Sequence, residues 1–303
     1  MQGKACRLQY REAAFGLQYR GTEYNMKDTL EKYQLVERSI QKTYHKDLWT
    51  PFTRAVKRYQ LIREGDRVAV CISGGKDSML MAKLVQMLHR HSEVPFEVVY
   101  LVMDPGYNEQ NRKKIEENAA LLHIPITVFE TRIFDIANNT GQSPCYLCAR
   151  MRRGALYTKA RELGCNKIAL GHHMNDVIET TVMAMFYSSQ LQGMLPKLHS
   201  RNFEGMELIR PLYCIREEAV LAWRNYNELE FIQCACRFTE NCTTCDNGNG
   251  GSKRQEVKGL IRRLKRFNPE IEQSIFNSLH AVNIETFPGY KAGGKAHSYL
   301  EDY

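Results

Sequence analysis

Residues 73–78 read Ser-Gly-Gly-Lys-Asp-Ser, a combination of residue types suited to holding a phosphate chain. The paired glycines allow a tight turn and bring backbone N–H groups close to an anion. An apolar run at 68–72 precedes this loop and another at 79–84 follows it, which predicts a strand, a loop and a helix whose positive end faces the same anion. The candidate phosphate-binding residues are Ser73, Gly74, Gly75, Lys76, Asp77 and Ser78.

The loop differs from a Walker A motif, because Asp77 separates Lys76 from Ser78. An acid repels phosphate unless a cation lies between them. We therefore expect Asp77 either to hold a divalent cation such as Mg²⁺ or to cap the helix, with Lys76 neutralising the phosphate. The alternative is an ordinary strand-to-helix turn in which the polar side chains satisfy backbone groups.

A second group of polar residues lies at 170–180, Leu-Gly-His-His-Met-Asn-Asp-Val-Ile-Glu-Thr, again at a strand end before a helix. Asp176 and Glu179 share one face of that helix near its N-terminus, where acids are favoured. One interpretation is simple helix capping. The other is that Asp176 faces the nucleotide as a metal ligand or proton acceptor, with Gly171 bordering the same crevice. A zinc site at His172 and His173 is disfavoured, because adjacent side chains at a strand end point apart.

The elements that must position these loops alternate along the chain. Apolar runs predict strands at 67–72, 97–103, 126–130 and 167–171, and helices at 78–91, 108–123, 149–163 and 175–188. This alternation predicts an α/β fold with a doubly wound, mostly parallel sheet. Ligands in such sheets bind beyond the carboxyl ends of the strands, where both polar loops fall.

Composition divides the chain into three predicted segments. Residues 1–62 form a helical N-terminal extension, 63–240 the nucleotide-binding domain, and 241–303 a Cys- and Gly-containing linker followed by basic helices. Within these segments, 197–205 is expected to be a loop, 230–233 a short strand and 288–303 irregular. We also expect a homodimer.

Ten cysteines are many for a reducing compartment, where grouped cysteines act more often as metal ligands or catalytic thiols than as disulfides. The groups are Cys145-x-x-Cys148, Cys234-x-Cys236 and Cys242-x-x-Cys245. The later cysteines could fold around Zn²⁺, which leaves zinc open at Cys242 and Cys245.

The chain has 303 residues, a formal net charge of +8 and no apolar stretch long enough to span a membrane. It also lacks a recognisable secretory signal, so we expect a cytoplasmic location. Lysine and arginine gather at 150–161 and 253–266, both predicted helices. Such helices suggest a nucleic-acid partner, although a solvated helix face is the commoner explanation of a charge run by itself.

The loop at 73–78 resembles the PP-loop of the ATP pyrophosphatase superfamily, whose fold is adenine nucleotide α-hydrolase-like. That resemblance implies cleavage between the α and β phosphates of ATP and transfer of AMP to a carbonyl oxygen. Together, Leu170 to Thr180, Cys145 to Gly154 and the segment Ile209-Arg210-Pro211-Leu212 resemble the TtcA/TtuA family of tRNA sulfur-transferring enzymes. The match is to the TtcA branch, which makes 2-thiocytidine in the anticodon loop.

This resemblance implies that Cys145, Cys148 and Cys234 hold a 4Fe-4S cluster, and that Arg152 and Asp176 act at the reaction centre with Lys76. It implies ATP and Mg²⁺ as ligands, tRNA as partner, and a sulfur donor such as a cysteine desulfurase, a sulfur carrier or free sulfide. Two departures put the modified nucleoside in doubt. Cys234-x-Cys236 replaces a wider pair, and Cys242 and Cys245 are additional.

The resulting hypothesis is an ATP-dependent tRNA sulfurtransferase that adenylates the C2 oxygen of a pyrimidine, with cytidine favoured, and replaces it with sulfur. One alternative is a PP-loop tRNA-modifying or amide-forming ligase without a cluster. The other is a zinc-containing tRNA-binding or redox-sensing protein. Activity that depends on the cysteines would favour the sulfurtransferase over the ligase. AMP release in the presence of tRNA would favour either enzyme over the binding or sensing protein.

Overall fold

The computed structural model describes residues 30–138, 144–232, 253–301 and 303 of the chain. Of the cysteines predicted to bind metal, Cys234, Cys242 and Cys245 lie outside the described residues, as does the side chain of Cys145.

The centre of the molecule is a six-stranded sheet with the order β3-β2-β1-β4-β6-β5. All neighbouring pairs are parallel except β5 and β6. The strands are β1 (Arg67–Ile72), β2 (Glu97–Asp104), β3 (Ile126–Glu130), β4 (Lys167–Ala169), β5 (Lys197–His199) and β6 (Glu207–Ile209). The mostly parallel α/β fold is thus confirmed, whereas 197–199 is an edge strand and not part of a loop.

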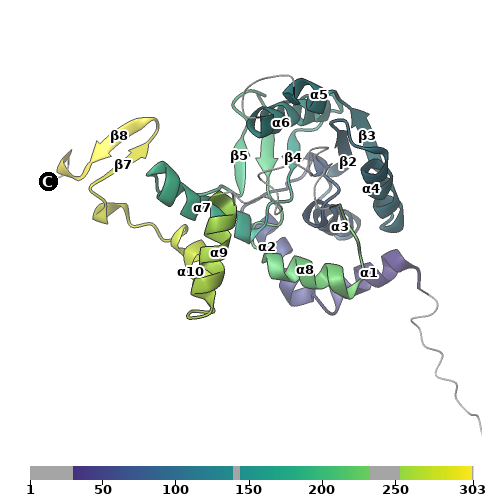
Figure 1. Cartoon of the computed structure of the whole chain (residues 1–303), viewed down its shortest axis with the longest axis horizontal. Coiled ribbons are helices and arrows are strands. Elements are labelled where there is room, and N and C mark those ends of the chain that lie inside the picture. Colours follow the sequence, from purple (N-terminus) through teal and green to yellow (C-terminus); the bar gives the residue numbers. More distant parts are fainter. Residues whose placement is uncertain (1–29, 139–143, 233–252, 302) are drawn as a thin grey trace, which may run out of the picture.

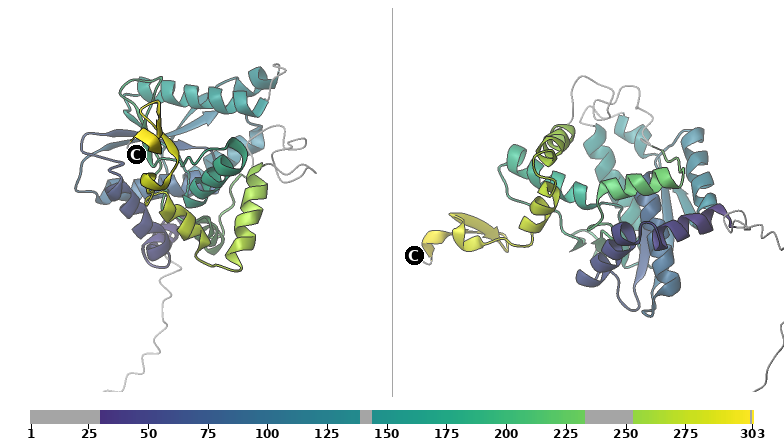
Figure 2. Two further views of the ribbon diagram at one scale, coloured as in Figure 1. Left: turned by 90° about the vertical axis from the view of Figure 1, so that its left-hand side faces the viewer. Right: turned by 90° about the horizontal axis from the view of Figure 1, so that it is seen from below.

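Helices cover both faces of this sheet, with α6 on one side and α1, α3 and α8 on the other (Figures 1 and 2). The helices are α1 (Lys32–Gln41), α2 (Thr50–Arg58), α3 (Lys76–His91), α4 (Glu109–Leu121), α5 (Ile133–Asn138), α6 (Pro144–Glu162), α7 (Met174–Ser188), α8 (Glu217–Tyr226), α9 (Lys253–Lys265) and α10 (Ile271–Ser278). A π-helical turn at His45–Trp49 joins α1 to α2. The helix after the PP-loop begins at Lys76, and α6 begins at Pro144, both earlier than the sequence pattern predicts.

Strand β1 explains why the layers hold together. Its side chains alternate between faces, so Val68 and Val70 join the core under α3 while Ala69 and Cys71 join the core under α6. On α3, the fully buried Lys83 donates to Glu37 of α1 at 2.9 Å. Because both faces of β1 are buried, the position of its carboxyl end, where the PP-loop begins, is fixed.

The C-terminal region packs beside the sheet through α7. Val257 and Ile261 of α9 and Phe276 of α10 share a buried cluster with Val177 and Ile178 of α7. Beyond α10 the chain forms a hairpin, β7 (Gly289–Ala292) and β8 (Lys295–Ser298), which projects from the body (Figure 1). The prediction of an irregular tail was wrong here.

The short strand predicted at 230–233 was also wrong, since residues 230–232, the described part of this range, belong to no strand. Buried residues of α1 and α2 belong to the same apolar cluster as residues of β1 and α3. The division of the chain at residues 62 and 240 stays a prediction. Within the described ranges, no helix combines the length and apolar character needed to cross a bilayer.

Candidate functional site: a crevice at the carboxyl ends of β1 and β4

The strand order reverses between β1 and β4, and both predicted functional loops leave the sheet at this point. A reversal leaves a crevice beyond the carboxyl ends, because consecutive connections run to opposite faces. Residues 73–75 follow β1 and residues 170–173 follow β4. The topology therefore brings the two loops together.

The PP-loop is closed by hydroxyl groups. Ser78 Oγ accepts from the backbone N–H of Ser73 at 3.1 Å and donates to the carbonyl of Gly75 at 2.9 Å. The hydroxyl of Ser73 lies 3.2 Å from Ser78 Oγ. Gly75 is the N-cap residue of α3, and no side chain caps it. The first N–H groups of α3 are consequently available to an anion.

Glycine is required at position 74 for two reasons. Its φ of +85° lies in the left-handed region. A Cβ there would also lie 2.5 Å from Ile115 Cγ1 and 2.7 Å from Ile232 Cδ1. The loop is thus packed against α4 and against the segment that follows α8.

Gly171 brings the second loop against the first. A Cβ at this position would meet the carbonyl carbon of Asp77 and the nitrogen of Ser78, both at 3.1 Å. The missing side chain therefore lets the β4–α7 loop touch the backbone at the start of α3. This contact confines a ligand of the PP-loop to the space between the two loops and α6.

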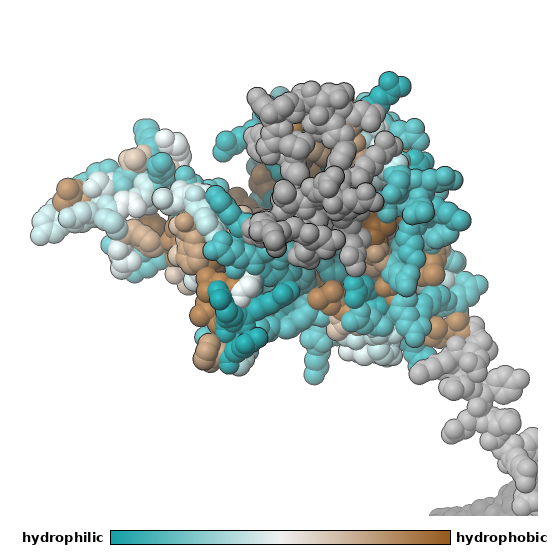
Figure 3. All heavy atoms as spheres, viewed as in Figure 1, coloured by the Kyte–Doolittle hydropathy of each residue, from teal (hydrophilic) through white to brown (hydrophobic). Residues whose placement is uncertain are grey.

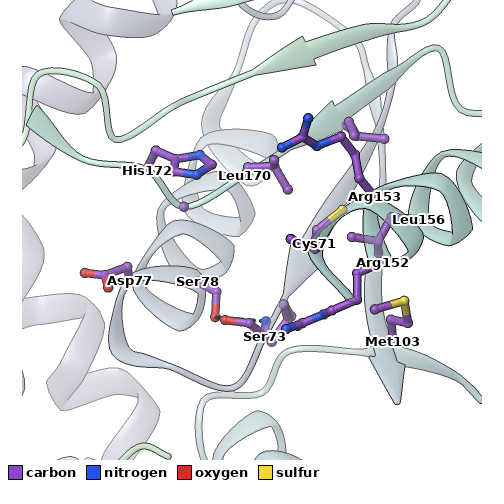
Figure 4. Close-up of a pocket in the computed structure, with 14 residues that line it drawn as sticks. Cys71, Ser73, Asp77, Ser78, Met103, Arg152, Arg153, Leu156, Leu170 and His172 are labelled. Atoms are coloured by element: carbon purple, nitrogen blue, oxygen red, sulfur yellow. Dashed lines mark hydrogen bonds between the residues drawn. The ribbon is translucent and has the colours of Figure 1, made fainter. Parts of the chain in front are cut away.

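That space is a cavity of about 350 Å³. In Figure 4, Ser73, Ser78 and Asp77 lie along one side and Arg152 and Arg153 of α6 along the other. The complete lining is Cys71, Ile72, Ser73, Asp77, Ser78, Met103, Ala149, Arg152, Arg153, Leu156, Ile168, Leu170, Gly171 and His172. Of the predicted residues, Ser73, Asp77, Ser78, Gly171 and Arg152 line this cavity. Gly74 and Gly75 shape its loop from behind.

Asp77 and Lys76 form a charged pair at the start of α3, with Lys76 Nζ 3.0 Å from Asp77 Oδ2. The other oxygen, Asp77 Oδ1, is buried, lies 3.8 Å from His173 Nε2 and has no hydrogen-bond partner among the described residues. Carboxylate oxygens are preferred ligands of Mg²⁺, so this orphaned oxygen fits a divalent cation. Lys76 Nζ also lies 3.6 Å from Glu217 Oε1 of α8.

Asp176 stands at the third position of α7, and both of its oxygens are engaged. Oδ2 accepts from the backbone N–H of His173 at 2.9 Å, while the Asp176 N–H donates to His173 Nδ1 at 3.4 Å. Oδ1 accepts from Arg254 of α9 at 2.9 Å. Burial raises the pKa of this carboxyl, but His173, His172 and Arg254 outweigh it and leave the pKa below its usual value. Asp176 is therefore ionised near pH 7. Helix capping accounts for Oδ2, which accepts from His173, but not for Oδ1, which accepts from Arg254.

The pKa of Glu179, one turn further along α7, shifts in the opposite direction. Burial raises its pKa, although Arg254 and Lys258 oppose the rise. Arg254 Nη1 lies 3.3 Å from Glu179 Oε2, and Lys258 Nζ lies 2.7 Å from Glu217 Oε2. The basic helix α9 thus directs two of its charges at acids beside the nucleotide site. Sequence reasoning missed this role, because the partners are 75 or more residues apart for Arg254.

Cys148 lies on α6, half-buried, where it packs against the same core cluster as Ile232. Burial raises the pKa of Tyr107, with Arg152 opposing and Cys148 adding to the rise, which places these side chains in one neighbourhood. The carbonyl of Ile232 lies 3.8 Å from the position of a Cβ at Gly75. Of the two parts of the chain that carry predicted ligands, the segment two residues before Cys234 lies against the PP-loop, and Cys148 precedes Ala149, which lines the cavity.

Thiolates are the ligands that hold Fe–S clusters, and Cys145 precedes Cys148 by three residues on the same helix. Their chemistry therefore fits an Fe–S cluster. Among the described residues, no group of three or more potential ligand side chains is assembled.

Comparison with known proteins agrees with this geometry. A model of the PP-loop domain matches residues 36–237. The chain is 36% identical over 234 residues to a tRNA-cytidine(32) 2-sulfurtransferase of Citrifermentans bemidjiense, a match that covers 76% of this chain and 88% of the relative. The same-named protein of Geobacter sulfurreducens is 34% identical over 233 residues, 76% of this chain and 87% of its own.

Among solved structures, the U34-tRNA thiolase NcsA from Methanococcus maripaludis, with its [4Fe-4S] cluster, superposes with a TM-score of 0.61. Its sequence is 21% identical, and 80% of each chain is covered, which shows a shared fold. The resemblance found in the motifs is confirmed over most of the chain. The chain therefore belongs to the PP-loop family and, within it, to the tRNA-cytidine(32) 2-sulfurtransferases.

Proposed function

We propose that this chain uses ATP to replace the C2 oxygen of a cytidine in the tRNA anticodon loop, position 32 by analogy with its relatives, with sulfur. The observation that carries the proposal is the contact of Gly171 with the backbone of Asp77 and Ser78. It makes one crevice of the phosphate-binding loop and the loop that leads to Asp176. A nucleotide and a base to be activated then meet in the same space.

The nucleotide is held by the PP-loop. The N–H groups at the start of α3 face the phosphates, and Lys76 neutralises their charge after leaving Glu217. Asp77 Oδ1 would hold Mg²⁺, which when bound would supply positive charge to stabilise the departing pyrophosphate. The described part of the crevice places these groups on the side of β1.

The base is activated on the opposite side of the crevice. Its C2 oxygen attacks the α-phosphorus, pyrophosphate leaves, and the base carries AMP on that oxygen. Arg152 reaches the cavity from α6 and stabilises the negative charge that develops at the α-phosphate. Ionised Asp176, oriented by His173 and Arg254, would serve as a metal ligand or a proton acceptor.

Sulfur then takes the place of the oxygen, and AMP departs with that oxygen. Cys145, Cys148 and Cys234 would hold a 4Fe-4S cluster, which when bound supplies an iron without a protein ligand as a carrier of sulfide. The chain's own part is to hold Cys148 half-buried on α6, next to Arg152 and the cavity. The donor of the sulfur is a desulfurase, a carrier protein or free sulfide.

The enzyme is proposed to act as a homodimer. Large apolar side chains are exposed at the end of α7 and in the following loop, among them Phe186 at 56% and Leu195 at 63%. Figure 3 shows apolar surface where the body meets the C-terminal region. Light scattering at several concentrations checks this, with a mass of about twice 35.1 kDa expected.

The function is tested with anaerobically purified protein whose iron, sulfide and zinc are quantified. The protein is incubated with ATP, Mg²⁺, sulfide and a tRNA transcript, and the digested RNA is examined by mass spectrometry. We expect 2-thiocytidine at position 32 and equal amounts of AMP and pyrophosphate. A transcript with uridine at position 32 is the matched control. AMP formation without thiolation of either transcript would contradict the proposal and favour a ligase.

A further inference from the structure

The segment Ile209-Arg210-Pro211-Leu212 has no role in the chemistry above, yet its arginine has unusual surroundings. Arg210 follows β6 and is half-buried, and burial lowers its pKa to about 10. Its Nη1 donates to the carbonyl of Leu195. Its Nε is buried without a hydrogen-bond partner among the described residues. An unsatisfied guanidinium donor of this kind calls for an acceptor beyond the described residues, such as a ligand.

His172 presents a second orphaned atom to the same region. Its Nδ1 is buried and lacks a hydrogen-bond partner in the part of the chain that the structure describes. Burial lowers its pKa to about 4, so the imidazole is neutral near pH 7. It can therefore donate or accept one hydrogen bond to a ligand without adding charge.

Both residues line a second cavity, of about 770 Å³, between α6 and the β5–β6 hairpin. The size is that of a site for a small molecule or a nucleotide. Its described lining contains four arginines and no acid, and the arginines are Arg150, Arg153, Arg201 and Arg210. An accumulation of uncompensated positive charge in a hollow surface favours a polyanion.

The wall of this cavity is built from packed structure. Tyr157 of α6 stacks on Phe203 of the hairpin with ring centres 4.9 Å apart, and the guanidinium of Arg161 lies 5.4 Å from the centre of the Phe203 ring. Ser200 Oγ accepts from the N–H of Phe203 at 3.1 Å. These contacts hold Arg201 beside the helix that carries Arg150 and Arg153.

The second cavity is continuous with the nucleotide crevice, because Ala149, Arg153, Leu170 and His172 line both. A base splayed out of an RNA loop brings its two flanking phosphates with it. Those phosphates must lie next to the crevice. On α9, by contrast, Arg254 and Lys258 form ion pairs with acids, so these two side chains are not available to bind phosphates.

We infer that the cavity between α6 and the β5–β6 hairpin is the site where the RNA backbone flanking the target base is bound, with Arg210 and Arg153 nearest the crevice and Arg150 and Arg201 further out. The inference rests on the proposed function, since it names the part of the tRNA that enters beside the same site. It assigns the Arg-Pro-Leu segment to substrate binding.

The test is the double variant Arg150→Gln/Arg201→Gln, since both side chains are exposed and neither lines the nucleotide crevice. Unmodified tRNA binding is measured by fluorescence anisotropy from 50 to 200 mM salt, and ATP binding by calorimetry. We expect at least a tenfold weaker tRNA complex and a salt slope smaller by about 1.4, at about 0.7 per lost contact to a single strand. ATP affinity should change less than twofold.

The matched control is Arg38→Gln/Lys42→Gln, which removes two exposed charges from α1 and the residue after it, across the sheet from α6. It should keep the wild-type salt slope. Arg210→Lys, which keeps a charge but loses Nε, should raise the KM for tRNA more than the KM for ATP.

A wild-type slope in the Arg150/Arg201 variant would overturn the inference, as would a loss of ATP affinity with tRNA binding intact. Thiolation by the wild type is assayed in the same preparation. Its absence contradicts the proposed function, whereas its presence together with an unchanged slope contradicts the inference alone.

Discussion

Arg254 of α9 donates to Asp176 Oδ1 at 2.9 Å, across 78 residues of sequence. The same guanidinium reaches Glu179 Oε2 at 3.3 Å and Thr180 Oγ1 at 3.4 Å. A helix outside the matched PP-loop domain therefore supplies the cation that faces the acids at the head of α7. The C-terminal region is thus joined to the nucleotide site by charge as well as by packing.

Replacing this cation has a predictable effect on pH dependence. In Arg254→Gln, the pKa of Asp176 rises because a source of its depression is lost. The acid limb of the kcat profile should move to higher pH, and stability should fall by on the order of 1 kcal/mol, since Arg254 is partly exposed. Single-turnover thiolation rates from pH 3.5 to 7, where an acid with a pKa below 3.8 titrates, report the shift.

Arg263→Gln removes a charge from an exposed position of the same helix and serves as the control. Its pH profile should match that of the wild type. Equal profiles for both variants would mean that Arg254 has no part in the ionisation of Asp176.

The contact between the two loops is tested by Gly171→Ala. The new Cβ would lie 3.1 Å from two backbone atoms of α3, so the β4–α7 loop must move away from the PP-loop. We expect ATP affinity to fall at least tenfold and the free energy of unfolding by about 1–3 kcal/mol. Calorimetric ATP titration and urea unfolding report the two quantities.

Gly259→Ala is the matched glycine substitution, because a Cβ there meets nothing within 4 Å. As an alanine in α9 it should raise stability by roughly 0.5–1 kcal/mol and leave ATP binding unchanged. Wild-type ATP affinity in Gly171→Ala would show that the loop contact is dispensable.

His172 makes the stability of the fold depend on acid. Burial lowers its pKa from 6.5 to about 4, so between these values the unfolded chain binds the proton and the folded chain does not. Stability contributed by the neutral ring is therefore complete above pH 6.5 and is lost as pH falls towards 4, by up to about 3 kcal/mol. Urea unfolding of the wild type and of His172→Asn at both pH values should show a smaller loss for the variant. Parallel pH curves would contradict this assignment.

The cysteines separate thiolation from ligase chemistry. Cys148→Ser should abolish iron content and thiolation, because a predicted thiolate ligand beside the crevice is removed. Cys165→Ala changes a buried cysteine of the core under α6 that does not line the cavity, and should keep both. Iron, sulfide and zinc are measured with the activity. Full activity of the Cys148 variant would favour the ligase without a cluster.

Much of the site could be predicted from local sequence, because its parts are local. The glycine pair and the apolar run before it define the PP-loop, and Gly171 marks the second loop in the same way. Strand β5 could not be found, since Lys-Leu-His at an edge has no apolar run. The earlier start of α6 carried a signal in Pro144, which suits the first turn of a helix.

Long-range charges were beyond prediction for a different reason. The sequence shows α9 as a basic helix, and its charges suggested RNA binding. Only the packing of Val257 and Ile261 against α7 turns Arg254 and Lys258 towards acids. The sequence likewise does not show that Arg210 lies in a cavity shared with α6, because that position depends on the β5–β6 hairpin.

The central claim is that AMP is transferred to the C2 oxygen of the target cytidine in the crevice between the PP-loop and Gly171. It is tested most directly with a tRNA whose cytidine 32 carries ¹⁸O at C2, incubated with ATP, Mg²⁺ and sulfide under one-turnover conditions. The account predicts that the heavy oxygen appears in the phosphate of AMP in a one-to-one ratio with the 2-thiocytidine formed. Thiolated tRNA accompanied by AMP without ¹⁸O would contradict it.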